Sequence, residues 1–384
     1  MHIEFNTKFR FDFKEEKPYR IGNKIDLKMI RYIPNEYFER AIHLREYLEV
    51  ENNSVFVQGK SYDHYTKDVY GITRWNNMSY AVLRDVYING ASVANNGTHA
   101  FLPNYYVQLD YIYGDGRGQV FEQFESVIAF GHMFTMTYGH WFLDYLSPMQ
   151  YLPKSVYRSS TILNIANFPD GKASLDVFNI SLEKRRFSQD GRRFFFSRQA
   201  YVLYDPIPHV RHFGTCLLNL SIILCDYYKL NEIKPTKFGL SNRKNKREAQ
   251  NWKEICDMIT KKYPEYDWTD VKDGLNISES AKQYASLTFL YAVTGSGLVK
   301  IMYMHPGSVV VDLQLNYNDH AMQSLALCKR ILMICYQEPG LQHHYTLKFN
   351  ATVDKAMKFV TYGINAWKLK KLPPELFNEP DRYI

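Results

Sequence analysis

The sequence lacks any run of 18 or more apolar residues, and a polar, charged segment follows Met1. We therefore expect no membrane-spanning helix and no secretory signal in the sequence as given. The cysteines are odd in number and lack Cys-x-x-Cys spacing: Cys216, Cys225, Cys256, Cys328 and Cys335. They indicate neither a disulfide framework nor a zinc site. The expected location is the cytoplasm, or the Golgi or ER lumen if an N-terminal anchor has been removed.

Internal repeats and low-complexity segments are also missing. The net charge is only +7, from 47 Lys and Arg against 40 Asp and Glu. Such a small excess suits an anionic small ligand and falls short of the dense basic stripe of a nucleic-acid binder. We therefore expect no nucleic-acid partner.

With 384 residues, the chain has the length of two domains. A hydrophobic content of 46% and a charged content of 23% are typical of a globular protein. Aromatic residues make up 16% of the chain. Two explanations of this abundance stay open. Tyr-rich clefts suit carbohydrate and nucleobase ligands, and an A/T-rich genome favours Tyr and Phe codons.

The spacing of apolar residues predicts a helix over residues 36–51 and short strands at 55–57, 80–83 and 85–88. Residues 231–236 are the expected linker, broken by Pro235. After the linker, strands alternate with helices. The predicted helices span residues 249–262, a stretch from Ser278 as N-cap to about residue 287, and residues 354–371. This alternation is typical of a parallel, doubly wound α/β unit.

His140 and Asp144 stand four residues apart, between Gly139 and Pro148, which mark the limits of a short helix. The spacing places both side chains on one helix face. A histidine and a carboxylate so placed can form a general base and the group that orients it. A purely structural His–Asp pair at a helix start is the alternative.

A strand at residues 289–293 runs into Thr294-Gly295-Ser296-Gly297, a helix start and a second strand, 309–313. A strand, Gly-rich turn and helix can present backbone N–H groups to an anion. Arg243 and Arg247 follow another strand at residues 238–241. Two guanidinium groups at the carboxyl edge of a sheet suit a pyrophosphate. Ordinary turn chemistry and an ordinary basic loop are the alternatives.

Three stretches in order resemble glycosyltransferase family 61. They are His140-Trp-Phe-Leu-Asp144-Tyr-Leu-Ser-Pro148, the Arg243, Arg247 and Asn251 spacing, and Thr294-Gly-Ser-Gly-Leu-Val-Lys300 followed by Tyr303-Met-His-Pro-Gly-Ser-Val-Val-Val-Asp312. The family includes plant xylan xylosyl- and arabinosyltransferases and animal O-linked N-acetylglucosaminyltransferases. The resemblance covers about residues 120–315.

The resemblance implies an α/β, GT-B-like fold in which two Rossmann-like domains face a central cleft, the first with extra N-terminal β elements. Residues 1–230 would form the acceptor-side domain, 237–350 the nucleotide-sugar domain, and 351–384 a helix packed back on the first domain. It also implies an inverting transferase without a metal or other cofactor. Its partners would be a nucleotide sugar, a UDP-sugar of a pentose or of N-acetylglucosamine, and a hydroxyl of a glycan or glycoprotein.

In this interpretation Asp144 or His140 is the base, and the choice between them stays open. The donor would be bound by Arg243, Arg247, Asn251, Thr294, Gly295, Ser296, Gly297, Lys300 and Asp312. The sequence departs from the family pattern at Thr294, Lys300 and Asp312, where the family has His, Asn and Glu. The loss of the histidine motivates a second hypothesis, a catalytically altered glycan- or nucleotide-binding protein on the same fold.

Overall fold

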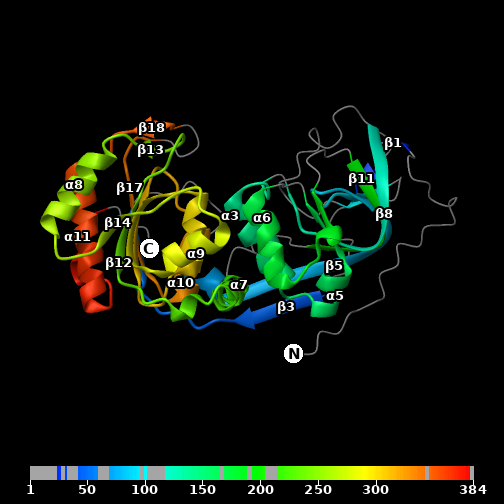
Figure 1. The fold of residues 1–384 in the computed structure, drawn as a ribbon, viewed down its shortest axis with the longest axis horizontal. Coiled ribbons are helices and arrows are strands. Elements are labelled where there is room, and N and C mark those ends of the chain that lie inside the picture. The colour runs from blue at the N-terminus through cyan, green and yellow to red at the C-terminus, as the bar shows by residue number, and fades with distance from the viewer. Residues whose placement is uncertain are drawn as a thin grey trace. The chain divides into compact units, whose positions relative to one another are not determined.

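The computed structural model of the protein (Figure 1) describes residues 24–26, 31–32, 42–58, 69–95, 99–101, 117–132, 134–164, 168–187, 193–203, 214–341 and 346–380. The chain forms two compact units. Unit 1 comprises residues 1–46 and 76–212, and unit 2 comprises residues 47–75 and 213–384. In the part of the chain that the structure describes, every helix is too short or too polar to cross a lipid bilayer.

This division differs from the predicted one. Residues 213–230 and the C-terminal residues 351–384 belong to unit 2, so the predicted linker at 231–236 lies inside that unit. A stretch of the N-terminal half, residues 47–75, also belongs to unit 2.

Unit 1 is built on a mixed sheet with the strand order β10–β9–β8–β11–β5–β6–β7–β2, while β1 pairs with β8 and β3 with β5. Strands β8, β9, β10 and β11 run parallel, and β5 is antiparallel to β11. The strands are β1 (Lys24–Asp26), β2 (Arg31–Tyr32), β3 (Ile42–Tyr47), β5 (Trp75–Ile88), β6 (Ala94–Asn95), β7 (His99–Phe101), β8 (Arg117–Ala129), β9 (Thr161–Asn164), β10 (Arg185–Phe187) and β11 (Arg193–Leu203).

Two predictions for this region need correction. Residues 42–47 form β3, so the helix predicted over 36–51 is wrong where the structure describes it. The two strands predicted at 80–83 and 85–88 are one long strand, β5. Asp85 lies within β5 at φ +50, which bends the chain without ending the strand.

The described helices of unit 1 follow the parallel strands. They are α3 (Tyr138–His140), the π-helix η3 (Trp141–Leu146), α4 (Ser147–Met149), α5 (Lys154–Ser159), α6 (Pro169–Ser174), η4 (Leu175–Phe178) and η5 (Leu182–Lys184). One face of the sheet packs around a core that includes Leu83, Val127, Leu163 and Val202.

Unit 2 is built on a fully parallel sheet with the order β14–β12–β15–β16–β17–β4. Its strands are β12 (Lys237–Ser241), β14 (Trp268–Asp270), β15 (Leu287–Val293), β16 (Val309–Gln314), β17 (Leu332–Gln337) and β4 (Val55–Val57). In chain order from β12, this is the 2-1-3-4-5 arrangement of a doubly wound fold. The α/β class is therefore confirmed, and the predicted doubly wound unit is present.

Helices cover both faces of this sheet (Figure 1). Helices α8 and α11 lie on one face, and α9, η8 and α10 lie on the other. The elements are α1 (Val69–Arg74), α7 (Thr215–Tyr227), η7 (Leu230–Glu232), α8 (Trp252–Lys262), α9 (Ile277–Ala285), η8 (Ser296–Tyr303), α10 (His320–Lys329), α11 (Val353–Leu369) and η9 (Pro374–Asn378), with a short pair β13 (Glu248–Ala249) and β18 (Lys348–Phe349).

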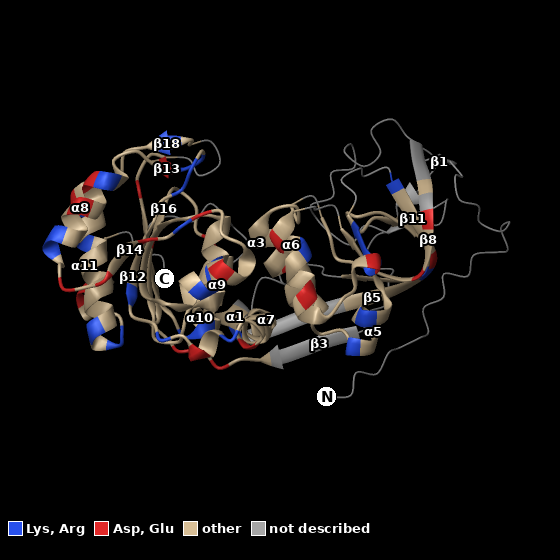
Figure 2. Ribbon diagram, in the orientation of Figure 1, with Lys and Arg blue, Asp and Glu red and all other residues tan. Residues whose placement is uncertain are grey.

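The final helix, α11, packs on the sheet of unit 2, and its predicted packing on the first domain stays a prediction. A Cβ atom at Gly363 would lie 2.5 Å from Val311 and 2.8 Å from Phe289, so only glycine allows this close approach of helix and sheet. Helix α8 lies on the same face, with Ile255 and Ile259 in the core and its Lys residues on the outer side (Figure 2).

The N-cap of α9 also differs from the prediction. Asn276, not Ser278, caps the helix, because its side chain accepts a hydrogen bond from the N–H of Glu279 at 3.0 Å.

Candidate active site

In unit 1, the chain turns sharply where β8 ends, at Gly131 and His132. A Cβ atom at Gly131 would lie 2.1 Å from the carbonyl oxygen of Gly90 and 2.6 Å from the side-chain oxygen of Asn164, so only glycine fits. Asn164 is the last residue of the neighbouring parallel strand β9. His132 therefore lies at the carboxyl edge of the parallel strands, where α/β folds place their ligands.

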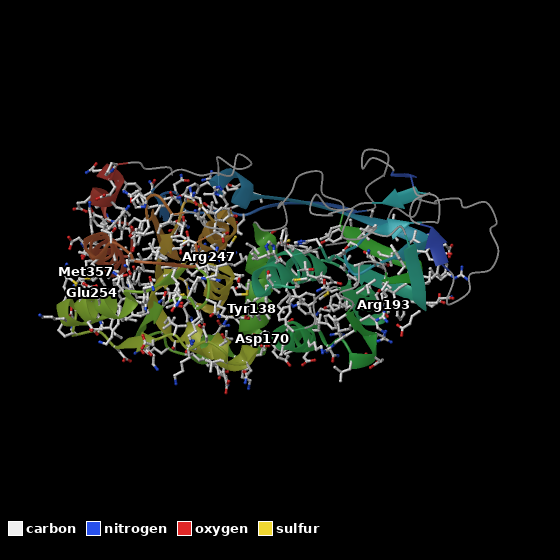
Figure 3. All side chains as sticks on the ribbon, turned by 90° about the horizontal axis from the view of Figure 1, so that it is seen from above. Tyr138, Asp170, Arg193, Arg247, Glu254 and Met357 are labelled. Atoms are coloured by element: carbon white, nitrogen blue, oxygen red, sulfur yellow. The ribbon has the colours of Figure 1, made fainter. Side chains whose placement is uncertain are left out.

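A helical segment that opens at Tyr138 (labelled in Figure 3) carries His140 and Asp144 toward this edge. Its middle turns are the π-helix η3. Pro148 supplies a reason, because a proline ring clashes with the carbonyl four residues earlier in a regular α-helix. Tyr145 fixes the segment to the sheet through a hydroxyl 2.7 Å from the carbonyl oxygen of Ile128 and 2.9 Å from that of Leu163.

The carboxylate of Asp144 lies between two imidazole rings. Its Oδ2 atom is 2.5 Å from Nε2 of His132 and 2.7 Å from Nδ1 of His140. The side chains of His132 and Asp144 are each 1% exposed, whereas that of His140 is 31% exposed. The predicted pairing of His140 with Asp144 is confirmed. We call these three side chains the relay.

Hydrogen-bond partners assign the protons of the relay. The backbone N–H of Phe134 donates to Nδ1 of His132 at 3.2 Å. Nδ1 is then an acceptor, so a neutral His132 carries its proton on Nε2 and donates it to Asp144. A neutral His140 likewise donates from Nδ1 to Asp144, which places its lone pair on Nε2. Of the two predicted bases, the partly exposed His140 has the geometry of a base, and the buried Asp144 has that of its orienting group.

The relay atoms could also be read as metal ligands, since all three lie within 4.8 Å of one another. A histidine that binds a metal through Nε2 usually donates Nδ1–H to an acceptor. Here Nδ1 of His132 faces a donor, the N–H of Phe134. The surroundings of His132 therefore favour proton transfer over metal binding.

In unit 2, Arg243 and Gly295 meet at the carboxyl ends of β12 and β15. A Cβ atom at Gly295 would lie 1.4 Å from a terminal nitrogen of Arg243 and 2.4 Å from its Cζ atom, so the guanidinium group lies directly on the glycine backbone. Strand order reverses between β12 and β15, which is the position where doubly wound folds bind ligands. The structure thus brings the two predicted stretches together.

The segment after β12 is an ordered loop. The side-chain oxygen of Asn242 accepts hydrogen bonds from the N–H groups of Arg243 at 2.8 Å and Ala249 at 3.1 Å. Arg247 adopts φ +58 and is buried (labelled in Figure 3), whereas the intervening residues 244–246 are exposed. The two arginines of this basic segment therefore point inward and its lysines outward.

Burial makes this pair of cations unusual. It lowers the pKa of Arg243, and nearby Asp273 partly offsets the effect. Burial also lowers the pKa of Arg247 to about 10, with a further contribution from Arg243, while Asp319 and Asp312 act in the opposite direction. Both guanidinium groups stay protonated at neutral pH and repel each other, so an anion beside them would be stabilised. We call Arg243, Arg247 and Gly295 the cradle.

Asp312 and Thr294 lie beneath the cradle and are fully buried. Gln314 donates a hydrogen bond to Oδ2 of Asp312 at 2.7 Å. Burial raises the pKa of Asp312 to about 7, and the hydrogen bond from Gln314 and the nearby hydroxyl of Thr294 oppose this rise. The charge of Asp312 opposes the lowering of the Arg247 pKa, and the predicted contact of Asp312 with the donor stays a prediction.

The other predicted donor residues fall into two groups. Ser296 and Gly297 open η8, directly after Gly295, and the ammonium group of Lys300 lies 5.8 Å from the ring centroid of Tyr284. Asn251 makes structural contacts, and its predicted contact with the donor stays a prediction. Its amide donates to the carbonyl of Ala351 and accepts from the N–H of Ala351, both at 2.9 Å, so it ties two loops together.

Sequence reasoning missed His132 and Asp273. His132 follows Gly131 directly after a strand, which is the available signal, although a histidine after a strand is common and carries no periodicity. Asp273 lies in a loop after β14, and only the folded chain brings it near Arg243.

Comparison with known families now bears on this geometry. Residues 138–311 match the family model of glycosyltransferase 61. The match supports membership of glycosyltransferase family 61. It begins at Tyr138, where the relay helix opens, and includes His140, Asp144, Arg243 and Gly295. His132 lies outside the matched residues. No curated protein sequence matches the chain.

Proposed function

We propose that this glycosyltransferase is an inverting, metal-independent enzyme that moves a sugar from a nucleotide sugar to a hydroxyl of a glycan or glycoprotein. The sugar is a pentose or N-acetylglucosamine, and the donor is a UDP-sugar. Unit 1 supplies the base and unit 2 holds the donor, as in a GT-B enzyme. The observation that carries the proposal is the contact of one buried carboxylate with two imidazoles.

The base is His140. Its Nε2 atom takes the proton of the acceptor hydroxyl as the acceptor oxygen bonds to the anomeric carbon and the bond to the diphosphate oxygen breaks. Asp144 holds the ring through Nδ1 and stabilises the imidazolium that forms. A single displacement of this kind inverts the anomeric configuration.

The leaving diphosphate is stabilised by the cradle. Charge that develops on the departing oxygen lies beside Arg243 and Arg247, which already repel each other in the unliganded protein. The N–H groups at the start of η8 add further donors. Protein groups alone thereby supply the positive charge that a metal supplies in other transferases.

A non-catalytic binding protein is the second candidate, motivated by Thr294. The relay argues against it, because a protein that only binds ligands needs no oriented base. Transfer or hydrolysis of the donor, measured beside simple nucleotide binding, separates the two.

The donor half is tested by thermal unfolding of the wild type and Arg243→Ala in the presence of UDP, GDP, CMP and ADP. One nucleoside diphosphate, expected to be UDP, should raise the unfolding temperature of the wild type by several degrees. The rise should shrink strongly in R243A. No rise with any nucleotide would contradict donor binding.

A further inference from the structure

An exposed apolar surface lies on the turn between His132 and the relay helix. Phe134 is 36% exposed and Met136 is 43% exposed, whereas Thr135 between them is fully buried. Two backbone hydrogen bonds shape this turn, from Thr135 N–H to the carbonyl of His132 at 3.0 Å and from Thr137 N–H to that of Phe134 at 2.9 Å. We call the side chains of Phe134 and Met136 the ledge.

The ledge lies next to the base. The ring of Phe134 stacks on that of His140, with centroids 5.5 Å apart and an interplanar angle of 29°. Phe134 also makes an edge contact with His132, at 6.0 Å. An acceptor whose hydroxyl meets Nε2 of His140 would therefore lie against Phe134 of the ledge.

The stretch of chain that forms the ledge contains no acidic or basic residue other than histidine. Residues 131–143 contain no Asp, Glu, Lys or Arg. A phosphorylated or otherwise charged acceptor would gain no ion pair from this stretch. The composition thus favours a neutral acceptor.

A sugar ring matches such a surface better than a peptide does. One face of a pyranose presents C–H groups that pack on an aromatic ring, while its hydroxyls project from the rim. A peptide bound in extended form needs backbone partners, and the carbonyls of His132 and Phe134 already accept bonds within the turn.

Building on the proposed function, we propose that the ledge is the acceptor subsite and that it takes a neutral pyranose ring. The apolar face of the sugar packs on Phe134 and Met136, and one rim hydroxyl reaches Nε2 of His140. The acceptor is then a glycan, not a serine or threonine of a bare peptide.

The test is saturation-transfer NMR on the full chain with UDP and a panel of methyl glycopyranosides of xylose, galactose, glucose and N-acetylglucosamine. The wild type should saturate the C–H protons of at least one pyranoside. Phe134→Leu and Met136→Ala should each weaken that binding by about three- to tenfold. Leu182→Ala, which shortens another exposed apolar side chain of unit 1 (75% exposed), is the matched control and should bind like the wild type.

Kinetics give a second readout. F134L should raise the acceptor KM about fivefold and leave the donor KM and the pH dependence of kcat unchanged. A changed pH dependence would instead show that Phe134 acts only by positioning His140. Met136→Ala answers the same question without removing the stacked ring.

The outcomes separate this inference from the proposed function. If H140A abolishes transfer but F134L and M136A bind pyranosides like the wild type, the ledge is not the subsite and the proposed function stands. Saturation of a Ser/Thr peptide instead of any pyranoside would also overturn the inference. Transfer that survives both H140A and D144N would contradict the proposed function itself.

Discussion

In unit 1 the polar groups that follow the parallel strands are a carboxylate and two imidazoles in contact, whereas in unit 2 they include two arginines of like charge close together. Asp144 accepts hydrogen bonds from two imidazole rings. Arg243 and Arg247 are like charges close together, and burial and the charge of Arg243 lower the pKa of Arg247. The first arrangement is complete before a ligand arrives and suits proton transfer. The second concentrates positive charge at the carboxyl edge of the sheet and suits a diphosphate.

The largest expected effect comes from the relay. His140→Ala and Asp144→Asn should each lower kcat by about 100- to 10,000-fold, the usual contribution of a general base. The donor KM should hardly change, because the proposed donor site is the cradle. Steady-state kinetics with saturating acceptor measure both constants. A large rise in donor KM in either variant would contradict the proposed division of roles between the relay and the cradle.

A smaller effect is expected from the cradle. Gly295→Ala places a methyl group where the guanidinium of Arg243 lies, so it should weaken donor binding about 10- to 100-fold, as removal of a charge-assisted hydrogen bond does. Isothermal calorimetry with UDP measures this. In Gly297→Ala a Cβ atom meets nothing within 4 Å, and the backbone N–H stays in place, so its loss should be several-fold smaller. Equal losses in the two variants would contradict the steric account.

His132 tests the relay in a different way, because it is expected to influence the rate through its contact with Asp144. His132→Ala should lower kcat about tenfold, the cost of one hydrogen bond to a buried charge. His132→Gln can still place an N–H near Asp144 and should recover most of the rate. The rates are compared over a range of pH, because a role limited to folding would not distinguish the two variants in this way.

The smallest effect concerns Asp312, beneath the cradle. Burial raises its pKa from 3.8 to about 7. The folded state thus prefers the protonated form, whose stabilising contribution is complete below about pH 4 and is lost as the pH rises to about 7. The Asp312→Asn variant has no carboxyl group at this position, so its stability should not fall in this way as the pH rises.

Thermal unfolding of the wild type and D312N measures the difference. The unfolding temperature of the wild type should fall relative to that of D312N by several degrees between about pH 5 and about pH 8. Asp354→Asn, at an exposed position of α11, should run parallel to the wild type over the same range. Parallel curves for D312N would contradict the assigned pKa.

Local sequence patterns predicted much of the fold of unit 2 and of the candidate site. The spacing of His140 and Asp144 defined a contact within one helical segment, and the alternation of strands and helices after residue 237 defined the doubly wound sheet of unit 2. The contact of Arg243 with Gly295 followed from topology, since both stretches end parallel strands.

Long-range pairing was not predictable. Strand β4 joins the sheet of unit 2 through pairing of Val55 with Met333, almost 280 residues away in sequence, and no local pattern encodes that choice. The same holds for α11, whose apolar stripe fits any apolar surface until Gly363 meets Val311. His132 was missed because its role depends on a turn that brings it back to Asp144.

Chemical rescue tests the central claim most directly. Removal of the His140 side chain leaves Asp144 and His132 in place, so added imidazole can take the position of the missing ring and accept the proton of the acceptor. We predict that H140A transfers sugar slowly and that the rate rises with imidazole concentration, while D144N does not respond. Transfer by H140A at the rate of the wild type, without imidazole, would contradict the assignment of His140 as the base.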